Sequence, residues 1–156
     1  MSHQRAGKES QTHILKPGVV MLVDDDPMFR NEMREVLEEE GFDVIALDSA
    51  NHALRHIQSR PWNWYPWLLI TDLVMDGMGG YNLMRRMTEL YPNKQIPMIV
   101  ASRLGAAEDV IEAEMAGASA YLTKPIEPQK MLDTIKRVTS QKPKKDLKLT
   151  TTSKLI

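Results

Sequence analysis

The chain has 156 residues, enough for one domain with a sizeable core, and its formal net charge of −1 gives no reason to expect a nucleic-acid or membrane partner. No apolar run approaches the roughly 20 residues that cross a bilayer, and the absence of cysteine excludes disulfides and thiolate metal sites. A cytoplasmic location is therefore expected.

Short apolar runs alternate along the chain with longer segments of helical periodicity. Residues 1–17 show neither and are predicted to be a flexible lead-in. The β-branched run Val19–Val23 predicts a strand, and the segment that starts at Pro27 and stops at Gly41 predicts a helix. The same alternation predicts strands at 43–47, 68–71, 98–101 and 118–123, and helices at 49–60, 80–90, 107–116 and 128–140.

Five strand–helix units of this kind predict an α/β domain over residues 18–140, with a parallel sheet covered by helices on both faces. Continuous apolar strands such as "WLLIT" fit a sheet that is buried on both sides. The remaining segment, 141–156, is basic and rich in threonine, and is predicted to be a solvated linker or tail.

Polar and charged residues follow the predicted strands at their carboxyl ends, where open parallel sheets have their functional crevices. Adjacent carboxylates repel one another and lose hydration beside a buried strand, so a cation is expected to compensate them. Carboxylate ligands without histidine or thiolate favour Mg²⁺, or Mn²⁺ in its place. The residues at these strand ends are Asp24, Asp25, Asp26, Asp72, Ser102, Lys124 and Pro125.

Asp72 beside such an ion is suited to attack phosphorus as a nucleophile and form an acyl phosphate. Lys124 is suited to hold one phosphoryl oxygen as a point charge, and Ser102 to donate a hydrogen bond to another. The predicted chemistry is phosphoryl transfer to aspartate. A serine–lysine hydrolase is disfavoured, because Ser102 lacks the nucleophile-elbow and oxyanion-hole glycine patterns.

The segment from about Gly18 to Ser140 resembles the receiver domain of two-component response regulators. The resemblance rests on "LVDDDP", "LLITDLVM" with Gly80 further on, "PMIVAS" and "GASAYLTKP", in this order. It implies a doubly wound, flavodoxin-like (βα)5 fold with strand order 2-1-3-4-5. It also implies a phosphorylation-driven switch that is not an enzyme in the ordinary sense, since it catalyses only its own phosphorylation and dephosphorylation.

The resemblance also implies a role for each acidic residue of the site. Asp72 matches the phosphoacceptor and a metal ligand, Asp25 the direct metal ligand, and Asp24 the acid that orients metal-bound water. Val74 matches the position that lends its backbone carbonyl to the metal.

On the last two strands, Ser102 matches the switch hydroxyl and Tyr121 the aromatic residue whose rotamer the family couples to it. Lys124 matches the phosphate-binding lysine, and the family uses a cis bond between it and Pro125 to aim its side chain.

Some residues around the site depart from the family's pattern. Asp76 stands where proline is common and brings extra negative charge, and Gly79 stands where aspartate is frequent. Arg103 replaces a small residue and would either screen the site or grip the phosphoryl group. Leu104 borders the path of the water that hydrolyses the acyl phosphate. Asp76, Arg103 and Leu104 are therefore candidate modulators of the kinetics.

The implied partners are a histidine kinase or phosphotransfer protein as donor, and a downstream protein target or an output domain outside this chain. A homodimer through helix 107–116, strand 118–123 and helix 128–140 is left open. No direct nucleic-acid contact and no membrane contact are expected. The alternative function is an interaction module of the same fold that works without phosphorylation. A metal-dependent phosphatase is disfavoured, because Val74 stands where a second aspartate would be needed.

Three further patterns have simpler interpretations. The loop "RPWNWYPW" at 60–67 gathers all three tryptophans, and either packs against helix ends or docks a partner, at the end of the sheet opposite the acids. His52 and His56 have the i, i+4 spacing of a zinc site but no third ligand, which favours an exposed helix face. The methionines at helical spacing are predicted to fill the core: Met84, Met87, Met115 and Met131.

Overall fold

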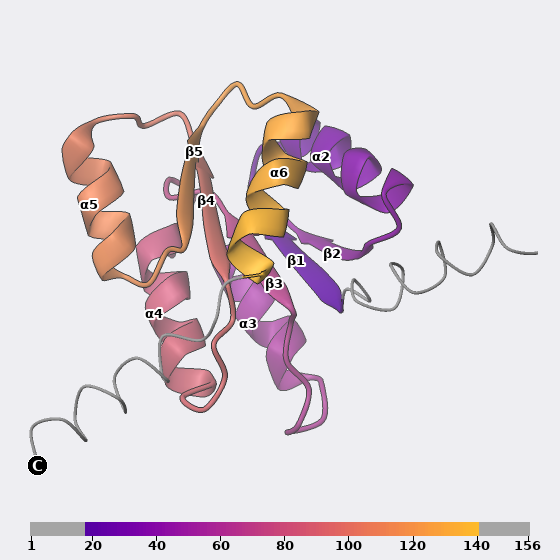
Figure 1. Ribbon diagram of the computed structural model, residues 1–156. Helices are drawn as coiled ribbons and strands as arrows, with labels where there is room; N and C mark the ends of the chain where they lie inside the picture. The colour runs from indigo at the N-terminus through magenta and orange to yellow at the C-terminus, as the bar shows by residue number, and fades with distance from the viewer. Residues whose placement is uncertain (1–17, 141–156) are drawn as a thin grey trace, which may run out of the picture.

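The computed structural model describes residues 18–140, in which five strands and five helices alternate along the chain (Figure 1). The predicted lead-in at 1–17 and tail at 141–156 lie outside the described residues. The strands are β1 (Val19–Val23), β2 (Asp43–Leu47), β3 (Leu68–Thr71), β4 (Met98–Ser102) and β5 (Ala120–Thr123). The helices are α2 (Pro27–Glu39), α3 (Ala50–Gln58), α4 (Gly80–Leu90), α5 (Ala107–Met115) and α6 (Pro128–Thr139).

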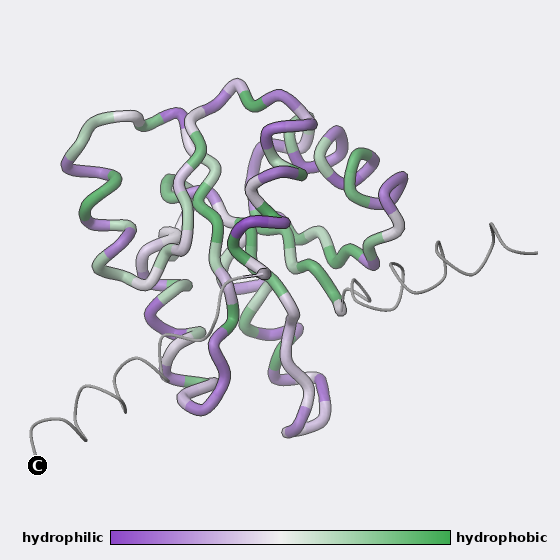
Figure 2. The backbone as a smooth tube through the Cα atoms, viewed as in Figure 1, coloured by the Kyte–Doolittle hydropathy of each residue, from purple (hydrophilic) through white to green (hydrophobic). Residues whose placement is uncertain are grey.

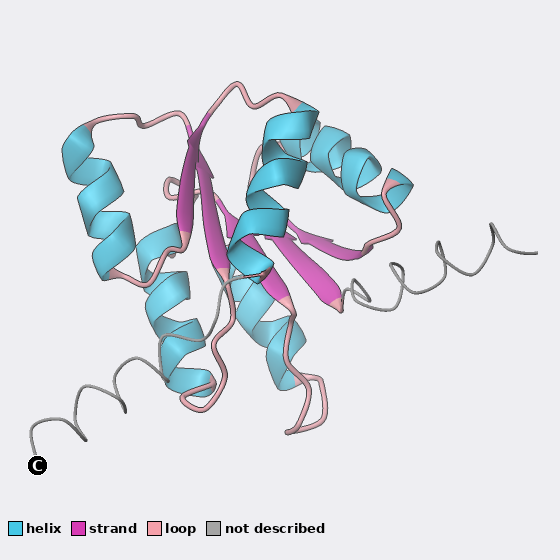
Figure 3. Ribbon diagram, viewed as in Figure 1, coloured by secondary structure: helices cyan, strands magenta, loops and turns pink. Residues whose placement is uncertain are grey.

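The strands form one parallel sheet in the order β2-β1-β3-β4-β5, with helices on both faces (Figure 3). Residues of α2 and α6 pack on one face, and residues of α3, α4 and α5 pack on the other. This arrangement confirms the predicted doubly wound fold and its strand order. Because every strand of a parallel sheet points the same way, all five carboxyl ends lie at one end of the sheet.

The core consists of two apolar layers that the sheet separates. Along β1, Val20 and Leu22 point to the α2 and α6 side, while Met21 and Val23 point to the other side. Figure 2 shows hydrophobic residues running along the strands, with polar residues on the outer turns of the helices. Buried strands of this kind hold the residues that follow them in fixed positions.

Three of the four predicted core methionines are buried: Met84, Met87 and Met131. The prediction for Met115 is wrong, since this side chain is 83% exposed. The physical reason is that α5 buries only Ala113 and packs on the sheet through small residues. Its last turn therefore points Met115 to solvent.

The predicted boundaries agree with the structure to within two residues, and local hydrogen bonds explain two of the differences. Ser49 precedes α3 as its N-cap, with its hydroxyl accepting a hydrogen bond of 3.0 Å from the backbone N–H of His52. Ala118 precedes β5, because its N–H donates at 2.9 Å to the carbonyl of Ala113 and closes the end of α5.

Candidate functional site

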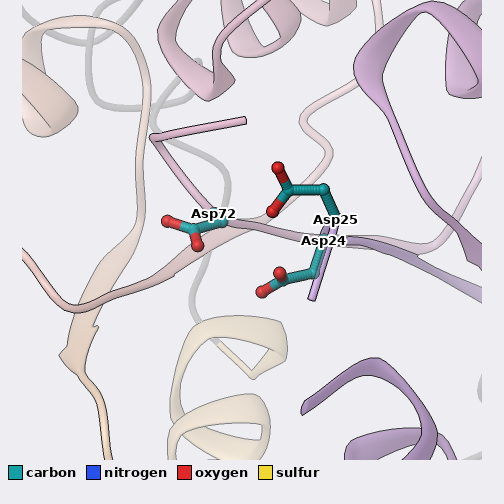
Figure 4. Close-up of side chains that lie close together, drawn as sticks. All are labelled: Asp24, Asp25 and Asp72. Atoms are coloured by element: carbon teal, nitrogen blue, oxygen red, sulfur yellow. The ribbon is translucent and has the colours of Figure 1, made fainter. Parts of the chain in front are cut away.

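The end of the sheet formed by the carboxyl ends of the strands brings the predicted acidic residues together. Figure 4 shows Asp24, Asp25 and Asp72 with their carboxylates gathered around one space. Among the described residues, these three form a group in which one oxygen of each lies within 4.8 Å of the others. Asp24 and Asp72 are buried and Asp25 is exposed. Oxygen ligands at this spacing fit a hard divalent cation such as Mg²⁺.

Lys124 supplies the positive charge of this pocket. Its Nζ lies 2.7 Å from Oδ2 of Asp24 and 3.1 Å from Oδ2 of Asp72, and its side chain is 8% exposed. Burial opposes the charge of the ammonium, but the hydrogen bonds to the two carboxylates outweigh it and raise the pKa of Lys124 above 10.5. One ammonium therefore offsets part of the charge of three carboxylates and leaves net negative charge for a metal ion.

The segment after β1 holds Asp24 by both its side chain and its backbone. The N–H of Asp26 donates to Oδ1 of Asp24 at 2.9 Å, and Arg30 donates through Nη1 to the Asp24 carbonyl at 2.7 Å. Burial, the largest influence, raises the pKa of Asp24 above 3.8, although the hydrogen bond from Lys124 lowers it in part.

Asp26, the third of the consecutive aspartates after β1, has a structural role. Its Oδ1 accepts a hydrogen bond of 3.0 Å from the N–H of Met28 and caps α2. Asp26 therefore stabilises the helix and stands outside the group of converging carboxylates.

Asp72 lies at the end of β3 with its two carboxylate oxygens in different surroundings. Oδ1 accepts hydrogen bonds from the backbone N–H of Leu73 at 2.6 Å and of Val74 at 3.3 Å, while Oδ2 faces Lys124. Gly80 begins α4 directly against this residue, since an added Cβ would lie 2.0 Å from the Asp72 carbonyl oxygen. Only glycine allows the helix to pass so close to the end of the strand.

The loop between β3 and α4 also reaches Asp25. The backbone N–H of Asp76 donates to Oδ2 of Asp25 at 3.2 Å, so the carboxylate that the resemblance assigns to the metal is oriented by this loop. A proline at position 76 would lack this donor. The departure at Asp76 therefore adds a backbone hydrogen bond in addition to a charge.

Ser102 and Tyr121 both form hydrogen bonds with the backbone of Leu104. The hydroxyl of Ser102, which is 1% exposed, accepts a hydrogen bond of 3.2 Å from the N–H of Leu104. The hydroxyl of Tyr121 donates to the Leu104 carbonyl at 2.5 Å, and burial raises the pKa of Tyr121 above 10.0. The loop after β4 is thus tied to the two residues that the resemblance couples as a switch.

The same end of the sheet includes the remaining predicted residues. The peptide bond between Lys124 and Pro125 is cis, the isomer that the resemblance implies. Val74 and Leu104 follow Asp72 and Ser102 by two residues each and are 62% and 39% exposed, and Arg103, directly before Leu104, is also exposed.

Two contacts of the pocket were not predicted. Phe29 and Arg30, in the first turn of α2, touch Lys124 and the Asp24 carbonyl. The sequence places Phe29 on the apolar face of the helix, but nothing in it shows that this face ends beside the lysine. These contacts depend on where the helix lies relative to β5, which periodicity does not give.

The tryptophan-rich loop lies at the opposite end of the sheet, as predicted. Trp64 packs on His56 and Arg60, and Trp67 stacks on Phe42, while Trp62 is 94% exposed. Two of the three tryptophans therefore pack against neighbouring side chains, while most residues of the loop are exposed.

The histidines of α3 have protein partners. Nδ1 of His52 lies 3.2 Å from Asp48, and Nε2 of His56 accepts a hydrogen bond from Arg60 at 3.1 Å.

No helix within residues 18–140 is long and apolar enough to cross a membrane.

Comparisons with known proteins point to the same kind of domain. The family model of the response regulator receiver domain matches residues 20–136. An uncharacterised 14.6 kDa protein of Leptolyngbya boryana is 34% identical over 113 residues, which cover 72% of this chain and 83% of that protein. The response regulator protein FleR of Pseudomonas aeruginosa is 33% identical over 76% of this chain, which spans only 24% of FleR.

Solved structures resemble the fold closely. A putative response regulator from Chloroflexus aurantiacus superposes with a TM-score of 0.72 at 30% identity, over 81% of this chain and all (100%) of that one. A CheY-like receiver domain protein from Methanospirillum hungatei gives a TM-score of 0.70 at 27% identity, over 80% of this chain and 94% of that one.

Proposed function

This chain belongs to the response regulator receiver domain family of two-component systems, and we propose that it accepts a phosphoryl group on Asp72 in a Mg²⁺-dependent reaction. The observation that carries the proposal is the position of Lys124, whose ammonium bridges Asp24 and Asp72 beside three converging carboxylates. An isolated acidic cluster has many explanations. A buried lysine bonded to the predicted acceptor favours a reaction in which negative charge develops beside Asp72, because the ammonium would stabilise that charge.

In this reaction a carboxylate oxygen of Asp72 forms a bond to phosphorus, and the bond from phosphorus to the donor's leaving atom breaks. The leaving group takes up a proton. Mg²⁺ held by Asp24, Asp25, Asp72 and the Val74 carbonyl would neutralise charge on the phosphoryl oxygens.

The protein's own residues supply the remaining contacts. Lys124 moves its hydrogen bond from Oδ2 of Asp72 to a phosphoryl oxygen, which has gained negative charge. Ser102 accepts from the Leu104 N–H, and its O–H would donate to a second phosphoryl oxygen. Because the Leu104 carbonyl also accepts a hydrogen bond from Tyr121, a movement of Ser102 and Leu104 in this step would shift Tyr121 on β5.

The phosphodonor in this proposal is a histidine kinase or a phosphotransfer protein in the cytoplasm. The receiver passes the signal to a downstream target or an output domain, which fits relatives such as FleR, of which this chain spans 24%. The face of α5, β5 and α6 is the proposed surface for that target or for a second copy. Ile111 and Met115 on α5 are 55% and 83% exposed and support this choice.

The test is phosphorylation by a small acyl phosphate such as acetyl phosphate, followed by intact mass. With Mg²⁺ the protein should gain one phosphoryl group, and with a chelator or as Asp72→Asn it should gain none. Asp43→Asn is the matched control, because it removes an exposed carboxylate at the opposite end of the sheet and should leave the gain unchanged. If the Asp72→Asn protein gains the same mass as the parent, the acceptor is elsewhere. If the parent gains none, the alternative of an interaction module stands.

A further inference from the structure

The aromatic ring of Phe29 covers the ammonium of Lys124. Nζ lies 4.1 Å from the ring centroid, the shortest of the cation–ring contacts within residues 18–140. Phe29 stands in the first turn of α2 and packs partly against the core layer between the sheet, α2 and α6. The ring is therefore held by the fold and cannot easily follow the lysine if the ammonium moves.

The ring is a third neighbour of the ammonium, in addition to the two carboxylates. An ammonium has three N–H donors, and two of them point to Oδ2 of Asp24 and Oδ2 of Asp72. The negative face of an aromatic ring attracts a cation, and the attraction is stronger where water is excluded. The Lys124 side chain is only 8% exposed, so its contact with the ring forms where little water is present.

We propose that Phe29 is a positioning residue for Lys124, which keeps the ammonium over Asp72 while its hydrogen-bond partners change. The inference rests on the proposed function. Phosphorylation of Asp72 requires the ammonium to exchange a carboxylate oxygen for a phosphoryl oxygen. A hydrogen bond is directional and is lost in such a shift, whereas attraction to a ring face varies little over a small displacement. The ring therefore holds the lysine through the exchange without favouring either partner.

A purely apolar role for the ring would give the same distance, so the test has to change the charge distribution of the ring and keep its size. Phe29 is replaced by 4-fluoro-, 3,5-difluoro- and 3,4,5-trifluorophenylalanine, which progressively weaken the negative face. The phosphorylation rate with acetyl phosphate at fixed Mg²⁺ should fall at each step, by about tenfold in all. Phe29→Leu should be at least as slow as the trifluoro protein.

The chain offers a matched control, since it contains only one other phenylalanine. Phe42 stacks on Trp67 with ring centroids 5.8 Å apart, at the opposite end of the sheet. The same fluorinated residues at Phe42 should leave the phosphorylation rate unchanged. Equal rates through the whole Phe29 series would overturn the proposal, because the ring would then act only as an apolar wall.

A second readout works without phosphorylation and so separates this inference from the proposed function. In the unphosphorylated protein, the ε-methylene protons of Lys124 should show an upfield ring-current shift in the NMR spectrum. The shift should disappear in Phe29→Leu and persist in Phe42→Leu. If the parent is not phosphorylated but shows this shift, the proposed function fails and the contact stands. If parent and Phe29→Leu give the same shift, the contact itself is absent.

Discussion

The ammonium of Lys124 is closer to Asp24, at 2.7 Å, than to the proposed acceptor Asp72, at 3.1 Å. A lysine in this position neutralises the same carboxylate that is expected to serve the metal. Metal ion and ammonium therefore repel each other across the pocket while both are attracted to its oxygens. Removing the ammonium should have opposite effects on metal binding and on phosphorylation.

We predict that Lys124→Met binds Mg²⁺ about three- to tenfold more tightly at low salt, because a positive charge leaves the site. Phosphorylation should be lost. In a chelator the variant should be about 3 kcal/mol less stable, since buried carboxylates lose their partner. Calorimetry and urea unfolding measure these effects, and Lys130→Met, at an exposed position, is the control. Unchanged Mg²⁺ affinity would show that the ammonium does not share the metal's pocket.

The raised pKa of Lys124 predicts a pH dependence of stability. A lysine whose pKa in the folded state exceeds its ordinary 10.5 contributes stability that is fully present below 10.5 and is lost as pH rises through the folded-state value. In a chelator, the difference in unfolding free energy between the parent and Lys124→Met should be constant at neutral pH and shrink above 10.5. A difference that stays constant to higher pH would mean that the ion pair contributes nothing.

Asp25 and Asp26 are neighbours with separable roles, and we predict that their alanine variants fail in different assays. Asp25→Ala should weaken Mg²⁺ binding by at least tenfold, because the proposed direct carboxylate ligand is removed. Asp26→Ala should leave Mg²⁺ affinity within about twofold of the parent and lower stability by about 1 kcal/mol, because Asp26 caps α2. Calorimetry and thermal unfolding distinguish the two. Greater loss of Mg²⁺ binding in Asp26→Ala would show that the assignment of the two acids is reversed.

The strand ends were predictable because each strand is short, apolar and followed at once by a polar residue. Val23 and Thr71 end β1 and β3 directly before Asp24 and Asp72, so the parallel order of the sheet alone brings these carboxylates together. The sequence also separates Asp26 from the two aspartates before it, because an aspartate directly before a proline is typical of a helix N-cap. The hydrogen bond from the Met28 N–H confirms this interpretation, and the group of three carboxylates is the predicted one.

Contacts that depend on the exact position of a helix or loop relative to the sheet were not predictable. The ring of Phe29 reaches Lys124, and the N–H of Asp76 reaches Asp25, through placements that periodicity leaves undetermined. For Met115, periodicity predicted a buried contact that the structure does not contain. Its spacing suited an apolar face, but α5 contacts the sheet through small residues and leaves the longer side chain in solvent.

Tyr121 ties β5 to the loop after β4, and we predict that Tyr121→Phe loosens this loop without unfolding the protein. The ring remains, but the hydrogen bond to the Leu104 carbonyl is lost. The Leu104 amide should exchange with solvent about fivefold faster, since one hydrogen bond contributes about 1 kcal/mol. Tyr81→Phe is the matched control, because that hydroxyl donates to the Asp109 carbonyl at 3.3 Å, outside the loop. Equal exchange in the two variants would contradict the link.

The lifetime of the phosphorylated state depends on how water reaches the phosphorus atom of the acyl phosphate. The receiver family resemblance places the residues that border its path two positions after the acceptor and two after the switch hydroxyl, here Val74 and Leu104. Both side chains are exposed, at 62% and 39%. Neither side chain has a group that orients a water molecule.

We therefore predict slow autodephosphorylation. Correct placement of a reacting water is worth orders of magnitude in rate, so Val74→Asn combined with Leu104→Glu should lose its phosphoryl group at least about tenfold faster than the parent. The measurement is the decay of phosphorylated mass in Mg²⁺ after the donor is removed. Ile111→Asn is the control, since it adds an amide at an exposed position on α5 outside the site. If the parent decays as fast as the double variant, Val74 and Leu104 do not limit access, and exposed Arg103 beside them becomes the residue to vary next.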